Sequence, residues 1–232
     1  DLWLDYEMSF ATTSDYDPPV PQGLAYLPYQ RAGIEQGVRR KRLLIGDEPG
    51  LGKTVQGIGI FNAVPRARSV LIVVPASLRL QWQKEWRNWC ARETSTQVFL
   101  STAGEATADV VIVSYDGVRN PSLHAKLMAR EWDLLILDEA HKVKDVGAKQ
   151  TQAVLGTAKV PGLAARADRI VALTGTPLPN RPNECFALVR ILNHDAIDRM
   201  SPKQFKEYYD ISMKAKNGHE FQTTGHLHEL QA

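Results

Sequence analysis

Five short runs of consecutive apolar residues constrain the fold of this chain more than any other feature of its sequence. Each run has only three to five residues, and continuous apolar runs of this length are typical of strands that are covered on both faces of a sheet. Gln97–Leu100 is a further, more polar candidate for a short strand. The five runs are Leu43–Ile45, Val70–Val74, Val110–Val113, Leu134–Leu137 and Ile170–Leu173.

Segments with helical character separate these runs. Strands that alternate with helices predict an α/β fold with a mostly parallel sheet and helices on both faces. In one segment, apolar residues spaced four, four and three apart lie on one helical face, and we expect them to be core rather than a platform for bases. These residues are Leu78, Trp82, Trp86 and Trp89. The predicted helices are Tyr29–Val38, Lys53–Asn62, Leu78–Trp89, Pro121–Ala129, Ala148–Leu155 and Arg181–Leu192.

Polar or glycine-rich sequence follows each of the five apolar runs. Right-handed crossovers place the carboxyl ends of parallel strands at one edge of a sheet, where the ligands of such sheets bind. The sequence therefore predicts one composite site at this edge. Its segments are Asp47–Thr54, Pro75–Ser77, Ser114–Tyr115, Asp138–His141 and Thr174–Thr176.

The first of these segments has the character of a phosphate-binding loop. Gly50 and Gly52 allow a tight turn that aims backbone N–H groups inward, and the following helix N-terminus favours an anion. Lys53 adds a positive charge for the β- and γ-phosphates, and the hydroxyl of Thr54 can bind Mg²⁺. The general pattern has glycine where this chain has Asp47. The plain alternative is a helix-capping glycine turn with a surface lysine.

The fourth segment supplies acidic groups for the same site. Asp138, at the end of a buried strand, can hold Mg²⁺, and Glu139 can orient or deprotonate an attacking water. Acidic residues are also common at helix N-termini because the helix dipole favours them. His141 either relays between the nucleotide and other loops or serves as a polar cap. With Lys53 and Thr54 at the same edge, we expect a site for a nucleoside triphosphate with Mg²⁺.

Composition limits the possible partners. The formal net charge is +2 over 232 residues, so any contact with nucleic acid must come from local basic patches. No apolar run approaches the roughly 20 residues that a membrane span needs, and the acidic, aromatic start does not resemble a signal peptide. We expect no membrane partner and an intracellular protein, cytoplasmic if prokaryotic or viral and nuclear if eukaryotic.

From about Gln22 onward, the motifs resemble in order those of the first RecA-like lobe of superfamily-two helicases, and among them the Swi/Snf-type double-stranded DNA translocases. The resemblance implies a RecA-like P-loop domain that uses ATP and Mg²⁺. Leu27-Pro28-Tyr29-Gln30 resembles the motif that reads adenine. Aspartate at position 47 is usual in the family's nucleotide loop. The implied nucleotide-binding residues are Gln30, Asp47, Gly50, Leu51, Gly52, Lys53 and Thr54, with Thr54 and Asp138 as the Mg²⁺ ligands.

The resemblance also implies roles at the remaining strand ends. Catalysis falls to Lys53, Asp138, Glu139 and His141. Backbone amides and hydroxyls bind phosphate without reading sequence, and the implied contacts to double-stranded DNA are Ser77, Ser114, Tyr115, Lys142, Lys144 and Thr176. The motif Thr174-Gly175-Thr176 is implied to couple hydrolysis to movement along DNA.

We expect the chain to have three parts, of which the first is indicated by its content of Asp, Thr, Ser and Pro and the other two by the resemblance. Residues 1–21 are expected to be an extended lead-in, 22–200 the ATP-binding lobe, and 201–232 a helical extension that leads to a second lobe. That second lobe supplies arginine fingers in the family, and no late arginine motif follows here. We therefore expect one lobe of a longer protein, with poor hydrolysis alone. Arg181–Glu184 and Gly225–Leu230 resemble the annealing-helicase branch.

Two other functions remain open on the sequence. An RNA helicase lobe also carries an Asp-Glu-Ala-His box, although the Pro-Tyr-Gln start and the Leu-Thr-Gly-Thr-Pro motif favour the DNA group. A non-catalytic binding module could keep the same fold. The intact set of Lys53, Thr54, Asp138 and Glu139 argues against such a degenerate module.

Overall fold

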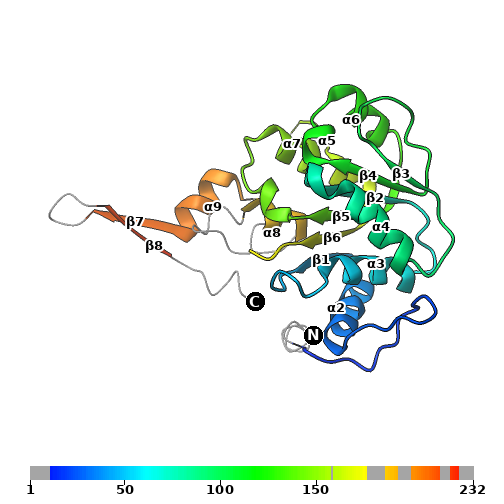
Figure 1. The fold of residues 1–232 in the computed structure, drawn as a ribbon. Coiled ribbons are helices and arrows are strands. Elements are labelled where there is room, and N and C mark those ends of the chain that lie inside the picture. The colour runs from blue at the N-terminus through cyan, green and yellow to red at the C-terminus, as the bar shows by residue number, and fades with distance from the viewer. Residues whose placement is uncertain (1–10, 158, 177–185, 193–199, 215–219, 225–232) are drawn as a thin grey trace.

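A computed structural model describes residues 11–157, 159–176, 186–192, 200–214 and 220–224. Six strands form one sheet in the order β1-β6-β5-β2-β4-β3, and every neighbouring pair is parallel. The predicted parallel α/β fold is therefore confirmed (Figure 1). The strands are β1 (Arg42–Ile45), β2 (Val70–Val74), β3 (Thr96–Val98), β4 (Val110–Ser114), β5 (Trp132–Asp138) and β6 (Ala167–Leu173).

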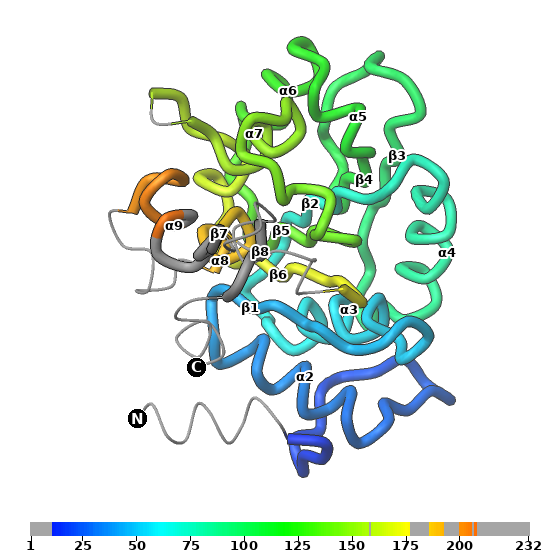
Figure 2. The backbone as a smooth tube through the Cα atoms, turned by 90° about the vertical axis from the view of Figure 1, so that its left-hand side faces the viewer, coloured from blue at the N-terminus to red at the C-terminus, as the bar shows by residue number. Residues whose placement is uncertain are grey.

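Helices cover both faces of this sheet, as predicted. Figure 2 shows α2 and α3 on one side of the strands and α6 and α7 on the other. The longer helices are α2 (Pro28–Arg39), α3 (Lys53–Ala63), α4 (Arg79–Trp89), α6 (Pro121–Met128), α7 (Lys149–Leu155), α8 (Phe186–Leu192) and α9 (Pro202–Tyr209). Short turns of helix are α5 (Tyr115–Val118), Ala76–Leu78, Ala140–Val143 and Leu163–Arg166.

Alternate residues of the central strands fill two separate cores. In β2, Leu71 and Val73 face the core with α5 to α8, whereas Val70, Ile72 and Val74 face the core with α2, α3 and α4. All five are fully buried, and burying such a side chain stabilises a fold by about 1.5–3 kcal/mol. This double burial explains why the strands read as continuous apolar runs rather than as alternating ones.

The sequence-based elements agree with the structure except near their ends. Gln97–Leu100 shifts to Thr96–Val98, with Leu100 63% exposed after the strand. A short 3₁₀ turn at Ala76–Leu78 precedes α4, which starts at Arg79. The first part of the predicted helix Arg181–Leu192 lies outside the described residues. The aromatic face of α4 is core, as expected, because Trp82 and Trp86 are 2% and 1% exposed.

The segment 201–232, expected to be helical, differs in its described part. After α9, the strands β7 (Asp210–Lys214) and β8 (Glu220–Thr224) pair antiparallel and extend away from the six-stranded sheet (Figure 1). Apolar Ile211 and Met213 alternate with polar residues, and this period of two is typical of a strand. The boundaries of the three predicted parts remain predictions.

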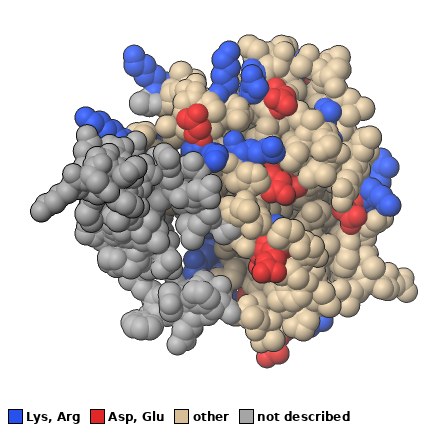
Figure 3. Space-filling view, turned by 60° about the vertical axis from the view of Figure 1, so that its left-hand side comes forward, with Lys and Arg blue, Asp and Glu red and all other residues tan. Residues whose placement is uncertain are grey.

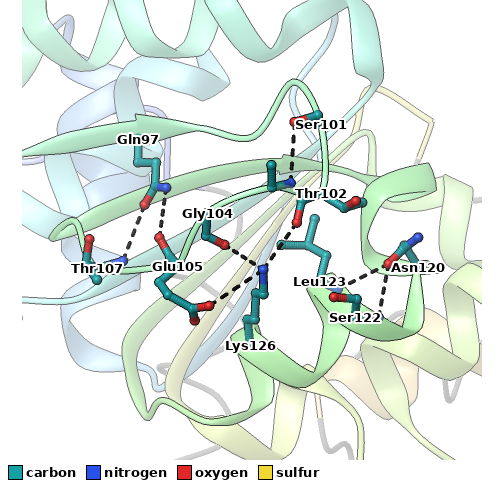
Figure 4. A network of polar contacts seen from close by, with 11 residues as sticks. Gln97, Ser101, Thr102, Gly104, Glu105, Thr107, Asn120, Ser122, Leu123 and Lys126 are labelled. Carbon is teal, nitrogen blue, oxygen red and sulfur yellow. Dashed lines mark hydrogen bonds and ion pairs between the residues drawn. The ribbon is translucent and has the colours of Figure 1, made fainter.

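Lysine 126 fixes the long connection between β3 and β4. Its Nζ donates to the carbonyl oxygens of Gly104 at 2.7 Å and Thr102 at 3.3 Å, and lies 3.7 Å from Glu105 Oε1. Figure 4 shows this side chain pointing from α6 into the loop. On the other side of the loop, Gln97 Nε2 donates to the Glu105 carbonyl at 2.9 Å. The loop is thus held from both the sheet and a helix.

No helix among the described residues is both long and apolar enough to cross a membrane.

Asp133 secures the start of the central strands. Its Oδ2 accepts from Arg68 N at 2.6 Å, Ser69 N at 2.8 Å and Ser69 Oγ at 3.0 Å. Burial acts to raise the pKa of this carboxyl, but these hydrogen bonds outweigh burial and the pKa is lowered. Because the folded state favours the charged form, this contribution to stability is present at neutral pH and is lost as pH falls through the folded-state pKa.

We predict that Asp133→Asn lowers the free energy of unfolding by about 1 kcal/mol at pH 7, because charged hydrogen bonds become neutral ones. The difference from the wild type should shrink as the pH falls below about 4, where carboxylates protonate in the unfolded chain. Urea unfolding at several pH values measures this. Asp116→Asn, which removes an exposed ion pair with Arg119, is the control and should change little. An equal loss at every pH would contradict the assignment.

Candidate active site

Neighbouring strands bring three of the predicted segments together. In the sheet, β6 lies between β1 and β5, and Leu173 of β6 is paired with Ile45 on one side and Asp138 on the other. The chain leaves all three strands at one level. Three segments therefore start side by side: the glycine-rich loop (Asp47–Thr54), the acidic pair (Asp138 and Glu139) and the threonine motif (Thr174–Thr176).

The glycine-rich loop has the backbone that its sequence predicts. Gly50 and Gly52 have φ of 91° and 74°, values that favour glycine. Gln30 supports the loop from α2, since its Nε2 donates to the Leu51 carbonyl at 3.3 Å and its Oε1 accepts from Leu27 N at 3.0 Å. A Cβ at Gly52 would lie only 2.5 Å from Gln30 Nε2. Gln30 is thus a buried support of the loop, a role that the sequence did not indicate.

Lys53 begins α3 and folds back over the loop. Its Nζ donates to the carbonyl oxygens of Asp47 at 2.6 Å and Glu48 at 3.0 Å. The carboxylate of Asp47 accepts from Gln56 Nε2 at 2.6 Å, which ties the start of the loop to α3. Thr54 is half-buried in the first turn of the same helix. The loop therefore carries an ammonium group and a hydroxyl at a helix N-terminus.

Asp138 ends β5 and is 8% exposed. Its Oδ2 accepts from Trp82 Nε1 at 2.7 Å, its Oδ1 from Glu139 N at 3.0 Å, and its carbonyl from Tyr115 Oη at 2.8 Å. Burial raises the pKa of Asp138, and the charge of Glu139 adds to this, while the Trp82 hydrogen bond and the charge of Lys53 act in the opposite direction. The sequence had placed Trp82 in the core but had not indicated this contact.

The next residue, Glu139, has an unusual backbone. Its φ is 51°, and it is the single non-glycine residue with a positive φ in the described part of the chain. Left-handed conformations of non-glycine residues cost about 1–3 kcal/mol and are concentrated at functional sites. The turn at Glu139 leads directly into the short helix Ala140–Val143. The half-buried Glu139 side chain thereby meets His141.

His141 links the acidic segment to the threonine motif. Its Nδ1 lies 3.2 Å from Glu139 Oε2, 3.1 Å from Thr174 Oγ1 and 3.3 Å from Thr176 Oγ1. Thr174 Oγ1 also accepts from Thr176 N at 3.1 Å. These contacts bring together four residues that the sequence had assigned to hydrolysis and coupling.

The threonine motif also contacts the glycine-rich loop. A Cβ added to Gly175 would lie 3.0 Å from Cδ and Cγ of Pro49, which is closer than ordinary contact between such atoms. Any larger residue at 175 would therefore press on the loop. The three segments thus form one continuous contact from the loop through Gly175 to His141 and Glu139.

The residues predicted to contact DNA divide into two groups. Ser77, Lys142, Lys144 and Thr176 are exposed. Ser114 and Tyr115 are both 5% exposed; Ser114 Oγ accepts from Gly117 N, and Tyr115 Oη donates to Asp138. The structure therefore does not offer these two side chains to DNA. On the face shown in Figure 3, basic and acidic side chains lie in small groups, without one broad basic area.

A cavity of about 630 Å³ borders the glycine-rich loop between α2 and β1. Among the residues that line it are Tyr29, Asp47 and Leu51, and the carbonyl of Leu51 also accepts from Gln30 Nε2. This volume lies within the range of small-molecule sites. A nucleoside base can therefore be accommodated next to a phosphate-binding loop.

The donor set fits Mg²⁺ bound together with a phosphate ligand. Among the described residues, no group of three or more His, Cys, Asp and Glu side chains could hold a metal by itself. Mg²⁺ is usually bound through one or two carboxylates together with substrate phosphates. The Asp138 carboxylate is a donor of this kind, and the hydroxyl of Thr54 is a second oxygen donor. The metal would therefore bind with the nucleotide rather than in a protein cage.

Several proteins of known character are similar in sequence. The SWI/SNF-related matrix-associated actin-dependent regulator of chromatin subfamily A-like protein 1 of Xenopus tropicalis is 28% identical over 90% of this chain. The DNA annealing helicase and endonuclease ZRANB3 of Bos taurus is 30% identical over 83%. The chain spans 21% and 17% of the length of these two relatives. An annealing helicase thus stands among the relatives, in line with the resemblance in sequence.

A solved structure confirms the fold. The Sulfolobus solfataricus SWI2/SNF2 ATPase core in complex with dsDNA has a TM-score of 0.69, with 22% sequence identity. The match covers 86% of this chain and 41% of that one. The described sheet and its helices therefore have the RecA-like architecture of that core.

A match to a protein-family model over most of the chain identifies the family. The model of the SNF2-related domain matches residues 29–230. That range contains the glycine-rich loop, the acidic pair and the threonine motif described above. This chain belongs to the SNF2-related domain family.

Proposed function

We propose that this chain is the ATP-binding first lobe of an ATP-dependent translocase on double-stranded DNA. The observation that carries the proposal is the continuous contact of the glycine-rich loop, the acidic pair and the threonine motif at one sheet edge. The loop holds Lys53 and Thr54, and the acidic pair lies two strands away. Relatives named as ATP-dependent or DNA helicases support the choice of ATP and DNA.

The residues have distinct roles in this proposal. Backbone N–H groups of the loop and the Lys53 ammonium bind the phosphates, with Thr54 and Asp138 as oxygen ligands of Mg²⁺. When bound, Mg²⁺ would neutralise charge on the phosphates. Glu139 orients the attacking water or accepts its proton. His141 lies between Glu139 and the two threonines, so a change at the water-activating carboxylate reaches the coupling motif.

The DNA contact is proposed at the exposed part of the same edge. Ser77, after β2, and Thr176, after β6, present hydroxyls, and Lys142 and Lys144 present positive charge. Such groups bind the phosphate backbone without reading base sequence, as a translocase requires. Arg79 keeps the loop with Ser77 in place, because its guanidinium donates to the carbonyl oxygens of Ala76 at 3.0 Å and Phe99 at 2.6 Å.

A lobe for single-stranded RNA is the alternative within the enzymes, and a non-catalytic binding module is the alternative outside them. The names of several similar proteins refer to DNA or chromatin, which favours DNA. The intact acidic pair and lysine favour catalysis. Comparing the stimulation of ATPase activity by duplex DNA and by single-stranded RNA distinguishes a DNA translocase from an RNA helicase lobe. Turnover of ATP by the full-length protein distinguishes an enzyme from a non-catalytic module.

We predict that Glu139→Gln in the full-length protein retains ATP binding and lowers turnover by about 10²–10⁴-fold, the usual contribution of a general base. Steady-state ATPase assays with duplex DNA and equilibrium binding of nucleotide measure the two effects. Glu131→Gln, whose carboxylate is exposed and paired with Arg166 far from the site, is the matched control. Near-normal turnover by Glu139→Gln would remove Glu139 from the catalytic group.

Charge reversal of Lys142 and Lys144 to Glu should weaken DNA binding by the full-length protein more than ATP binding. The slope of log affinity against log salt should fall in magnitude by about 0.9 for each phosphate that the protein no longer neutralises. DNA titrations at several salt concentrations measure this slope. Arg66→Glu with Arg87→Glu makes the same charge change at exposed positions outside this edge. Unchanged DNA affinity at low salt would exclude the two lysines from the DNA surface.

The 232-residue chain by itself should hydrolyse ATP poorly. Arginine fingers contribute about 10³–10⁵ in rate where they have been measured, and the resemblance places them in a second lobe. ATPase rates of this chain and of the longer protein, each with and without duplex DNA, make the comparison. A strong DNA-stimulated rate from the chain alone would show that no second lobe is needed.

A further inference from the structure

One buried hydrogen bond connects α4 to Asp138, the proposed metal ligand. Helix α4 follows the segment Pro75–Ser77, which we call the proposed DNA loop. Trp82 Nε1 on α4 donates to Asp138 Oδ2 at 2.7 Å, and the two residues are 2% and 8% exposed. The indole needs no water or intermediate side chain to reach the carboxylate. A direct link therefore joins one of the helical layers to the acidic pair.

The same helix starts at the proposed DNA loop. Exposed Ser77 lies in the 3₁₀ turn Ala76–Leu78, and α4 follows without a break at Arg79. Trp82 is five residues beyond Ser77, about 7.5 Å along a helix at about 1.5 Å per residue. Because continuous helical turns join Ser77 to Trp82, a displacement of the loop that carries α4 with it shifts the indole relative to Asp138.

The hydrogen bond also limits how the carboxylate can turn. With Oδ2 bound by Trp82 and Oδ1 bound by Glu139 N, both oxygens of Asp138 have fixed directions. Groups that orient a metal ligand from behind are often worth 10–100-fold in metal affinity. An indole N–H suits this position because it can only donate and cannot compete for the metal.

We propose that Trp82 is a positioning residue that sets the direction of the Asp138 carboxylate toward Mg²⁺ and makes that direction depend on the DNA loop at Ser77. The inference rests on the proposed function and deepens it. DNA on the loop shifts the start of α4, α4 carries the indole, and the indole orients the carboxylate. Because Trp82 is only 2% exposed, it acts through Asp138 and not by contact with nucleotide or DNA.

The same helix provides a matched control. Trp86, one turn after Trp82, is 1% exposed, and its Nε1 donates to Thr94 Oγ1 at 3.0 Å, away from the acidic pair. Its ring packs on Phe61 with centroids 4.9 Å apart. Trp82→Phe and Trp86→Phe therefore delete the same indole N–H from the same helix at nearly equal burial. They differ in whether the acceptor is Asp138.

The test uses the full-length protein and a non-hydrolysable ATP analogue as probe. Binding of the analogue is titrated against Mg²⁺ concentration, with and without duplex DNA, for both variants. Trp82→Phe should raise the Mg²⁺ concentration for half-maximal binding by about tenfold or more, and DNA should no longer change that concentration. Trp86→Phe should keep the wild-type Mg²⁺ dependence and its response to DNA.

Four results would overturn the inference: an unchanged Mg²⁺ dependence in Trp82→Phe, equal shifts in both variants, a full response to DNA in Trp82→Phe, or a Mg²⁺ dependence in the wild type that does not respond to DNA. If the wild type itself binds no nucleotide with Mg²⁺, the proposed function fails instead. Should Trp82→Phe not fold, the assigned indole N–H resonance of Trp82 in the wild-type chain decides. It should shift when Mg²⁺ is added with the analogue, while that of Trp86 stays in place; an unshifted Trp82 signal would contradict the inference.

Discussion

The geometry of the candidate site depends on the hydrogen bonds that hold the buried Asp138. A charged group with so little exposure is costly unless donors surround it. Two of its donors come from side chains on opposite faces of the sheet, Trp82 from the core with α4 and Tyr115 from the core with α5. Because the indole binds a carboxylate oxygen and the phenol binds the main-chain carbonyl, both helical layers are packed to hold the end of one strand.

A second constraint is steric. The order of β1, β6 and β5 in the sheet places three strand ends within contact distance, and small groups at the contact let the loops approach. Gly175 lies against Pro49, and His141 lies against Thr174 and Thr176. A shift of the glycine-rich loop therefore cannot leave the threonine motif unchanged. For the proposed translocase, this contact is a direct physical route from the nucleotide loop to the coupling motif.

The sequence predicted the sheet well because strands buried on both faces leave continuous apolar runs, as β2 and β5 do. It also predicted that five strand ends meet at one edge, since parallel topology requires this. Which side chains form hydrogen bonds across distant segments was not predictable from the sequence. The role of Trp82 depends on which acceptor lies opposite its ring, and Ser114 and Tyr115 were assigned to DNA by motif although their hydroxyls bind within the protein. The sequence did not predict the antiparallel pair β7 and β8, because the alternation of apolar and polar residues in β7 is short and directly follows the aromatic residues of α9.

The left-handed backbone at Glu139 has a consequence for how the site can be altered. Glycine adopts this conformation without the penalty that glutamate bears, so the residue that suits the backbone best at this position is one without a carboxylate. Stability and chemistry thus favour different residues there. Variants selected only for thermal stability would tend to lose the acidic side chain, as expected where a strained site trades stability for activity. The glutamate at this position is therefore explained by chemistry rather than by stability.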